Sequence, residues 1–386
     1  MTEVARQGPL SGIRIVEMAG IGPAPFAAML LADLGAEIIA IDRLVRSDNG
    51  IARPPKFDIG NRGRARIALD LKSEAGVVVA RQLIGRADGL IEGFRPTVME
   101  RLGLGPERCL VDNSRLVYGR LTGWGQTGPL ASSAGHDLNY IALSGALDAI
   151  GQAGGPPVPP LNLLGDYAGG SLLFAFGFVS ALLYSRASGE GQVVDSAMID
   201  GVALLLAPMM GLRQAGLHGP ERGTNVLDGG APFYGVYQCA DGLWVSIAPI
   251  EQKFRRILLD HIGFDPDTIP DVSDRAAWPE AHRLLADRFL TRPREEWCAI
   301  LEGTDACFAP VLSMEDAPSH PHNSQRMNFV DVGGVLQPSP APRFSRTPAT
   351  PPSATVPSAR EALSQWGVSA EQASQLIESG VLALRT

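Results

Sequence analysis

Short apolar segments alternate with helical patterns through the first third of the chain. The apolar segments predict strands at residues 13–18, 37–42, 66–71, 89–94 and 115–121. Helical patterns separate several of them, the first over residues 26–34. Strands joined through helices run parallel, because each crossover returns the chain to the same edge of the sheet. The alternation therefore predicts a doubly wound α/β sheet.

The pattern becomes helical from residue 137, with further helices predicted over 167–186 and 195–216. Two alternating segments around Asp241-Gly242 predict a β-hairpin with a type I′ turn. The predicted organisation is a large α/β domain of residues 1–195 and 332–386, a linker helix at 196–222, a smaller α+β domain at 223–320 and a return linker at 321–331. Near the end, Ser358 and Ser369 each stand three residues before a Glu or Gln, which predicts two capped helices.

Composition excludes several classes of partner. A net charge of -8 argues against nucleic acid and anionic membrane surfaces as partners.

The N-terminal residues lack the basic-then-apolar pattern of a signal peptide, and the apolar run at 171–184 is too short to span a bilayer. No cysteine pair has CxxC or zinc-ligand spacing, so the four cysteines are expected to be reduced thiols: Cys109, Cys239, Cys298 and Cys307. We therefore expect a cytoplasmic protein without a metal site.

Charged side chains follow the predicted strands. Asp42 ends the second strand, where it could hold a ribose hydroxyl, and the next residue, Arg43, suits a phosphorylated ribose. Lys72 and Arg95 come just past two other strands. The carboxyl ends of parallel strands meet at one crevice, so these cations predict a polyphosphate ligand such as coenzyme A. A solvated charged face is the alternative.

The stretch "SSAGHDLNY" places His136 and Asp137 after four small residues and before a helical pattern. A helix start presents free N–H groups and the positive end of the dipole. Such a position favours a neutral histidine that can accept a proton, and it offers N–H donors to an oxyanion. The alternative is a capping region with a half-buried histidine.

Two further carboxylates lie at predicted helix starts. Asp166 in "NLLGDYAGG" precedes a long apolar helix, where an aspartate is commonly the N-cap. Glu251 in "APIEQKF" follows the hairpin and is expected in the first turn of a helix. Taken singly, each is explained by helix capping as well as by catalysis.

At these residues the chain resembles the α-methylacyl-CoA racemases, a branch of the family III CoA-transferase superfamily. The resemblance covers nearly the whole chain, through "GPLSGIRIVEMAGIGPAPFAAMLLADLGAEIIAIDR", "GWGQTGP", "AGHDLNY", "PPLNLLGDYAGG", "GEGQVVDSAMIDG", "NVLDGGAPFY", "GTDAC" and "PAPRFSRTP". The racemase pattern Gly-His-Asp-x-Asn-Tyr is met by Gly135, His136, Asp137, Asn139 and Tyr140. Transferases of the superfamily typically lack this histidine.

The resemblance implies a Rossmann-like large domain, a smaller α+β domain and an interlocked homodimer, in which Glu251 serves the partner's site. His136 and Asp166 would flank the α-carbon of an acyl-CoA thioester. One would remove the α-proton to give an enolate, and the other would return a proton to the opposite face. Asp137 would orient the site or cap the helix. No metal or redox cofactor is implied, since coenzyme A is part of the substrate.

The resemblance also implies a set of coenzyme A contacts along the crevice: Ile21, Arg43, Leu69, Asp70, Leu71, Lys72, Gly93, Phe94, Arg95, Arg101, Gly135, Asn139 and Tyr140. Two alternatives to a racemase are a CoA-transferase with Asp166 as nucleophile and a CoA-ester-binding protein without turnover. The chain departs from the family pattern in "PIEQKFR" around Glu251 and in "LVRSDNGIARPPKF" at 44–57. These departures bear on the acyl pocket, so the natural acyl chain stays open.

Overall fold

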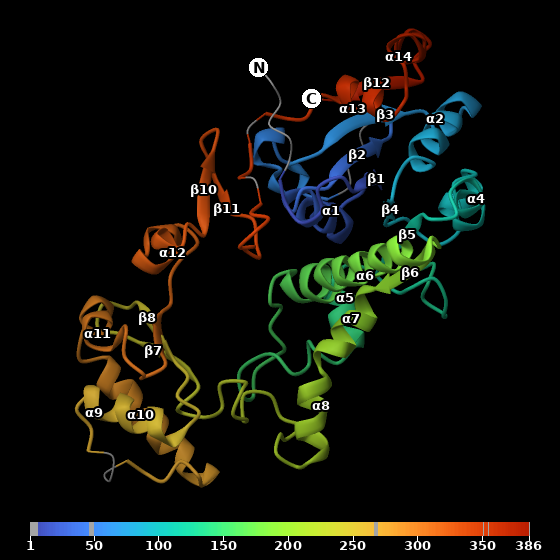
Figure 1. Cartoon of the computed structure of the whole chain (residues 1–386). Coiled ribbons are helices and arrows are strands. Elements are labelled where there is room, and N and C mark those ends of the chain that lie inside the picture. Colours follow the sequence, from blue (N-terminus) through green and yellow to red (C-terminus); the bar gives the residue numbers. More distant parts are fainter. Residues whose placement is uncertain (1–6, 46–49, 266–268, 350, 354, 386) are drawn as a thin grey trace. The chain divides into compact units, whose positions relative to one another are not determined.

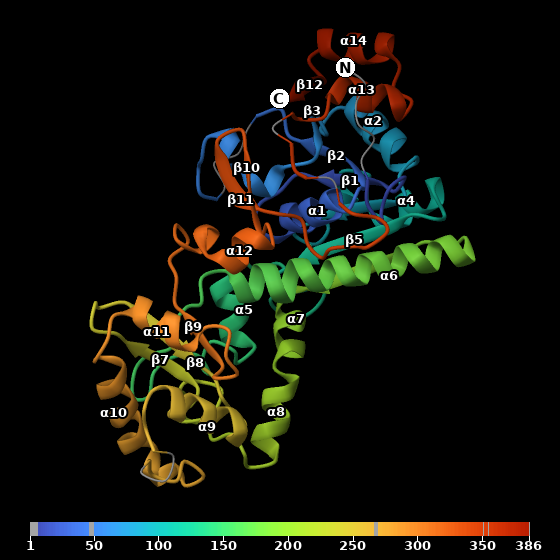
Figure 2. The ribbon, with the colours of Figure 1, turned by 60° about the vertical axis from the view of Figure 1, so that its left-hand side comes forward.

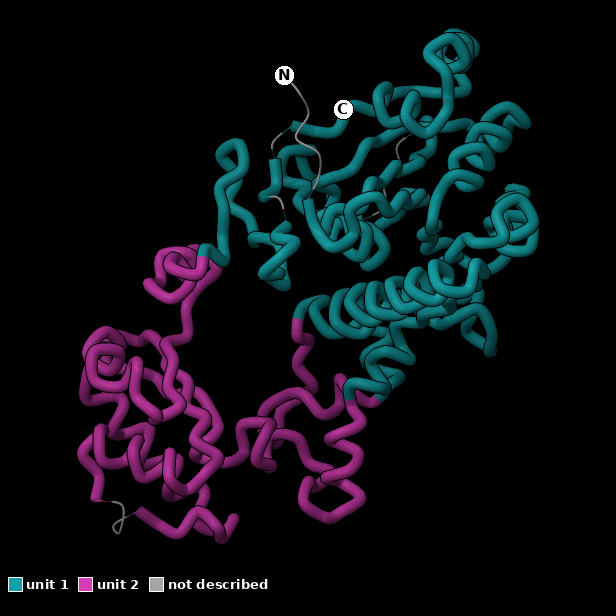
Figure 3. The backbone as a smooth tube through the Cα atoms, in the orientation of Figure 1, with its two compact units in different colours: residues 1–144, 161–205, 327–386 teal, residues 145–160, 206–326 magenta. Residues whose placement is uncertain are grey.

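The computed structural model describes residues 7–45, 50–265, 269–349, 351–353 and 355–385. These residues form two compact units, which Figure 3 colours separately. The first unit contains residues up to 144, residues 161–205 and residues from 327 onward. The second contains residues 145–160 and 206–326.

The elements of the first unit are β1 (Arg14–Met18), α1 (Pro23–Asp33), β2 (Glu37–Asp42), η1 (Pro55–Phe57), η2 (Ile59–Asn61), β3 (Ala65–Leu69), α2 (Glu74–Ile84), β4 (Gly89–Glu92), α3 (Val98–Arg101), α4 (Pro106–Asp112), β5 (Val117–Thr122), α5 (Asp137–Leu143), the π-helix η3 (Leu163–Leu172), α6 (Leu173–Ser188), β6 (Gln192–Ala197), α7 (Met198–Leu205), β10 (Phe329–Val332), β11 (Val335–Pro338), α13 (Ala359–Gln365), α14 (Ala370–Glu378) and β12 (Leu382–Arg385). Those of the second unit are α8 (Ala207–Gln214), β7 (Gly235–Gln238), β8 (Trp244–Ile247), α9 (Gln252–His261), η4 (Arg275–Ala277), α10 (Trp278–Phe289), α11 (Arg294–Leu301), β9 (Phe308–Pro310), η5 (Ala317–Ser319) and α12 (Pro321–Gln325).

A seven-stranded sheet in the order β12-β3-β2-β1-β4-β5-β6 organises the first unit (Figure 1). The six strands from β3 to β6 are parallel, and the central strand β1 pairs through Val16 with both Ile39 and Leu90. The predicted doubly wound α/β sheet is confirmed. Strands on the two sides of β1 are added in opposite directions, so a topological switch point lies between β1 and β4. Ligands of open α/β sheets bind outside the carboxyl ends of the strands at such a point.

Helices cover both faces of this sheet. Successive side chains of β2 lie on opposite faces of the sheet. Ile39 and Ile41 pack in an apolar cluster with residues of α2 and α13, whereas Ile38 packs in the cluster on the other face, with residues of α1 and α6. Strands covered on both faces need apolar side chains at successive positions, which explains the continuous apolar runs seen in the sequence.

Helix η3 and helix α6 form one helical run, Leu163–Ser188, of 26 residues. By length and composition alone this run could cross a membrane. Phe174, Phe178 and Leu182 of the run are buried in the cluster that contains α1 and β5, which agrees with the prediction of a core helix.

Two details of the predicted first unit were wrong. The third strand ends at Leu69, so Leu71 and Lys72 lie in the turn beyond it. The helix predicted over 195–216 begins later and is two helices, because β6 occupies Gln192–Ala197. Strand β6 has only two adjacent apolar residues among polar ones and is defined by its parallel pairing with β5.

The chain ends on the far edge of the sheet. Ser358 Oγ and Ser369 Oγ accept hydrogen bonds from the Glu361 and Gln372 amides, so both predicted N-caps are confirmed. The sequence did not reveal β12, which pairs antiparallel with β3 (Figure 2).

A three-stranded antiparallel sheet, β7-β8-β9, forms the centre of the second unit. The predicted hairpin is present, but its turn is not type I′, which needs a positive φ at both central residues. Of Asp241 and Gly242, only Gly242 has a positive φ, of 79°. The Gly242 amide donates to the Cys239 carbonyl and the Cys239 amide to the Leu243 carbonyl, which makes a three-residue loop.

The proline-rich segment 145–160 joins the second unit. Arg222 Nη2 lies 2.5 Å from Asp148 Oδ1, and its Nη1 donates to the Gly155 carbonyl at 2.9 Å. The sequence-based boundaries had placed this segment in the large domain.

Candidate active site

The predicted ligand-binding residues gather at the carboxyl ends of the parallel strands. Ile21 follows β1, Arg43 follows β2, Lys72 follows β3 and Arg95 follows β4, while Arg101 ends α3. The side chains of Ile21 and of all four cations are exposed. The predicted placement of Arg43, Lys72 and Arg95 past the strand ends is confirmed. The contact of all five residues with coenzyme A stays a prediction.

Some of the other predicted contact residues are held by the fold itself. Leu69 and Tyr140 are buried in the core. Asp70 Oδ1 accepts a hydrogen bond from the Lys72 amide at 3.0 Å, and Phe94 packs partly buried against the core. In the segments 69–72 and 93–95, the groups left to contact a ligand are therefore the main chain and the exposed side chains of Lys72 and Arg95.

Tyr140 shapes the loop that carries His136. Its hydroxyl donates to the Gly135 carbonyl at 2.5 Å, and its ring packs edge-on against Trp124 at a centroid distance of 4.8 Å. Burial raises the pKa of Tyr140 to about 12, so the phenol stays a neutral donor at physiological pH.

His136 directly precedes helix α5, as predicted. Its backbone is extended, with φ −132° and ψ 173°, and its amide donates to Asn139 Oδ1 at 3.0 Å. The Asn139 side chain thus fixes the peptide that enters the helix, and the His136 side chain is exposed to solvent.

Asp137 connects the two segments that carry the candidate acid and base. It is only 5% exposed, and its Oδ1 accepts a 2.7 Å hydrogen bond from the amide of Asp166. Its Oδ2 is buried and has no hydrogen-bond partner among the described residues. The Asp137 side chain therefore has a structural role, because it binds the main chain of Asp166. This role agrees with the prediction that Asp137 orients the site.

Asp166 is not an N-cap, contrary to the expectation for its position. The helical run begins at Leu163, so Asp166 lies in the first turn of the π-helix η3, and its Oδ2 accepts from Asn162 Nδ2 at 3.0 Å. Burial raises the pKa of Asp166, and the Asp137 charge adds to the increase; the Asn162 hydrogen bond and a charge on His136 oppose it.

Close packing behind Asp166 explains two of the small residues around it. A Cβ on Gly165 would lie 2.5 Å from Asp137 Oδ1, so only glycine fits there. Ser171 Oγ lies 2.9 Å from the Asp166 carbonyl oxygen and 2.8 Å from that of Pro23, so its one hydroxyl proton can be donated to either. π-Helical turns are rare and occur often at functional sites.

Glu251 lies in the second unit. It is the residue before α9 rather than in its first turn, and its carbonyl oxygen accepts from the Phe254 and Arg255 amides. Its side chain makes no capping hydrogen bond and is exposed, so the carboxylate is available to a ligand or a partner.

The sequence analysis missed a buried charge cluster behind residues 93–95. Glu92, 2% exposed, accepts from the Phe94 amide at 2.7 Å and from Arg120 Nε at 3.1 Å, and Arg120 also pairs with Glu100. Burial raises the pKa of Glu92 to about 7. Asn162 was missed as well, although its i, i+4 spacing from Asp166 was a usable signal.

The arrangement can move protons. It offers an exposed imidazole at a helix start and a carboxyl group with a raised pKa, held together by one buried aspartate. Among the described residues, no three His, Cys, Asp or Glu side chains gather as metal ligands would.

Residues 10–361 match the family described as CoA-transferase family III, and the chain belongs to this family. It is 45% identical to the mouse alpha-methylacyl-CoA racemase, over 95% of this chain and 96% of the mouse protein. It is 41% identical to the human protein of the same name, with the same two coverages. A CAIB/BAIF family protein from Brucella suis has a similar structure, with a TM-score of 0.79, 25% identity and coverage of 97% of this chain and 100% of that one.

Proposed function

We propose that this protein is a racemase that interconverts the (R) and (S) forms of 2-methylacyl-CoA thioesters. The observation that carries the proposal is the Asp137–Asp166 hydrogen bond, which holds Asp166 beside the residue that follows His136. The similarity to two alpha-methylacyl-CoA racemases over 95% of the chain supports it.

The proposed reaction is a proton exchange at the α-carbon. In one direction neutral His136 removes the α-proton, and the electron pair moves into the thioester carbonyl to give an enolate. Protonated Asp166 then donates a proton to the opposite face, which inverts the centre. The raised pKa of Asp166 favours its acid form, and main-chain N–H groups at the start of α5 are the proposed donors to the enolate oxygen.

The proposed chemistry requires no metal or redox cofactor, since the thioester carbonyl itself acidifies the α-proton. We assign the phosphates of the coenzyme A portion to the exposed cations Arg43, Lys72, Arg95 and Arg101 at the strand ends. Nucleic acid and membrane partners are not part of the proposal. A cytoplasmic location is part of the proposal, because the four cysteines are free thiols.

Proton NMR in heavy water tests the reaction. One enantiomer of a 2-methylacyl-CoA is expected to lose its α-proton signal while the opposite enantiomer appears. His136→Ala and Asp166→Asn should each lower the rate by about 10²–10⁴-fold, the usual contribution of a positioned acid or base. His261→Ala, which removes an exposed histidine from α9, is the matched control and should leave the rate unchanged. Undiminished exchange by the His136 variant would overturn the mechanism.

A CoA-transferase is the second candidate, because membership of CoA-transferase family III leaves it open. In that reaction the Asp166 carboxylate attacks the thioester and releases the coenzyme A thiolate, forming an acyl anhydride. Hydroxylamine would trap this anhydride, and a free carboxylic acid would accept the coenzyme A. Absence of both the adduct and the exchange would exclude the transferase.

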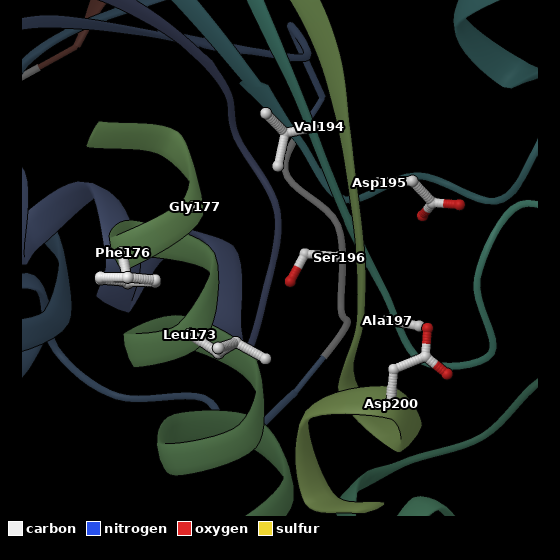
Figure 4. Close-up of a pocket in the computed structure, with 8 residues that line it drawn as sticks. All are labelled: Leu173, Phe176, Gly177, Val194, Asp195, Ser196, Ala197 and Asp200. Atoms are coloured by element: carbon white, nitrogen blue, oxygen red, sulfur yellow. The ribbon is translucent and has the colours of Figure 1, made fainter. Parts of the chain in front are cut away.

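We also propose a homodimer in which Glu251 of a second copy reaches the His136–Asp166 site. An apolar groove between α6 and β6 supports a partner surface (Figure 4). Phe176, 72% exposed, and Leu173 line its helix side, and β6 is one of the two edge strands of the seven-stranded sheet. Light scattering is expected to give the mass of a dimer, and Phe176→Glu should shift it toward the monomer. A monomeric wild-type protein with full racemase activity would overturn this assignment.

A further inference from the structure

The candidate acid, Asp166, lies in a π-helix that depends on its surroundings. Helix η3 runs over ten residues, Leu163–Leu172. Most π-helical segments are single turns inserted into α-helices, so a run of this length needs support from tertiary contacts. Each amide of a π-helix bonds the carbonyl group five residues before it, and this register decides in which direction the Asp166 side chain leaves the helix. The contacts that hold the register therefore bear on the acid.

Helix α7 supports the second half of η3. A Cβ on Gly201 would overlap the Gly169 carbonyl oxygen, so the main chains of the two helices touch at these glycines. Asp166 lies in the first half of η3 and needs a separate contact.

Ser171 supplies a contact to that first half. It is fully buried, and its Oγ lies 2.9 Å from the Asp166 carbonyl oxygen and 2.8 Å from the Pro23 carbonyl oxygen. Whichever oxygen receives the proton, the hydroxyl group lies between the two carbonyl groups and joins η3 to the first residue of α1. An alanine at 171 would leave both buried oxygens without this donor.

The start of α1 also faces the carboxyl group of Asp166. A Cβ on Gly22, the residue before α1, would lie 3.7 Å from Asp166 Oδ2, which is van der Waals distance. The same short segment thus approaches the Asp166 main chain through Ser171 and the carboxyl group directly. The rings of Phe26 and Tyr167, with centroids 4.5 Å apart, join α1 to η3 as well, so loss of the hydroxyl should shift Asp166 without detaching the helices.

We infer that Ser171 is a positioning residue for Asp166: its hydroxyl group holds the Asp166 main chain so that the carboxyl group faces the α-carbon of the acyl-CoA thioester. The inference rests on the proposed function for the role of Asp166. Because Ser171 is fully buried, it acts through Asp166 and not on the ligand. It should therefore affect proton transfer at Asp166 more than at His136, which precedes a different helix.

Proton NMR of one 2-methylacyl-CoA enantiomer in heavy water separates the two transfers. Loss of the α-proton without inversion needs only His136, which is exposed and can exchange its proton with solvent, whereas inversion also needs Asp166. For the enantiomer that His136 deprotonates, Ser171→Ala should lower the rate of inversion about tenfold and raise the ratio of α-proton exchange to inversion. The kcat for inversion should fall while KM stays unchanged.

Ser185→Ala is the matched control. Ser185 is a buried serine of the same helical run, and its Oγ donates to the Arg115 carbonyl oxygen at 2.6 Å. Arg115 precedes β5, at the end of the strand away from the site. The control should lose a similar hydrogen bond but keep the wild-type ratio. Ser171→Cys retains a weaker donor and should lie between the wild type and Ser171→Ala.

Amide hydrogen exchange of residues 163–172, measured by mass spectrometry, gives a readout that is independent of the reaction. It should be faster in Ser171→Ala than in the wild type and unchanged in Ser185→Ala. Unchanged amide exchange in Ser171→Ala, or an unchanged ratio and kcat in an active enzyme, would overturn the inference alone. A wild type that does not racemise, together with faster amide exchange in Ser171→Ala, would reject the proposed function but not the support of Asp166 by Ser171.

Discussion

The amide of Asp166 donates a 2.7 Å hydrogen bond to the buried carboxylate of Asp137, although the two residues are 29 positions apart in the sequence. This bond joins the start of α5 to the first turn of η3. The candidate base, His136, is therefore the sequence neighbour of Asp137, whose side chain binds the main chain of the candidate acid, Asp166. The bond also brings a second negative charge close to Asp166, which helps to raise the pKa of that group.

Asp137→Asn should lower the pKa of Asp166. The asparagine oxygen can still accept from the Asp166 amide, so the geometry is retained while the repelling charge is removed. In the direction in which Asp166 donates a proton, the fall of kcat/KM at high pH should move to lower pH. Asp331→Asn, at the exposed position of β10, is the control. A profile identical to that of the wild type would contradict the assigned role.

Asn162→Ala should have the opposite effect. Asn162 Nδ2 donates to Asp166 Oδ2 at 3.0 Å and lowers the pKa of that carboxyl group. Without this donor the acid form of Asp166 is favoured further, so the same limb of the pH–rate profile should move to higher pH. Because Asn162 is exposed, water will replace part of the lost bond, and the movement should be small. Movement in the same direction as Asp137→Asn would refute the prediction.

Gly165→Ala should destabilise the protein by roughly 2 kcal/mol or more, since the added Cβ would lie 2.5 Å from Asp137 Oδ1 in a packed interior. Racemase activity should fall with it, because the Asp137–Asp166 bond must shift. The matched control is Gly211→Ala in α8, where a Cβ meets nothing within 4 Å. That substitution should stabilise by about 0.5–1 kcal/mol through helix propensity. Urea denaturation of both variants measures the difference.

Stability should fall as the pH rises from about 5 to 8, in part because of Glu92. Its pKa is raised from 4.5 to about 7 in the folded protein, so between these values the folded state binds more protons than the unfolded state. The free energy of unfolding contributed by Glu92 therefore decreases with pH in this window. Urea midpoints at pH 5 and pH 8 should differ less for Glu92→Gln than for the wild type. An equal difference in the two proteins would exclude Glu92 as the cause.

Elements with a strong local pattern were predictable. Strand β2 was found at its observed bounds, and His136 was correctly placed at a helix start, because apolar runs and turn residues are local signals. Strands β6 and β12 were missed, since their short segments are defined by pairing with β5 and β3. The ion pairs of buried Arg120 with buried Glu92 and exposed Glu100 were missed for the same reason: the three residues lie on separate elements.

The sequence by itself determined the parallel α/β class, the catalytic candidates and the resemblance to a family, because these depend on periodicity and on residue types in order. Only the tertiary structure decided that Asp166 lies inside a π-helical turn, that Asp137 holds it, and that β12 pairs with β3. Hydrogen bonds and strand registers between distant segments depend on how the whole chain packs. No local pattern encodes them.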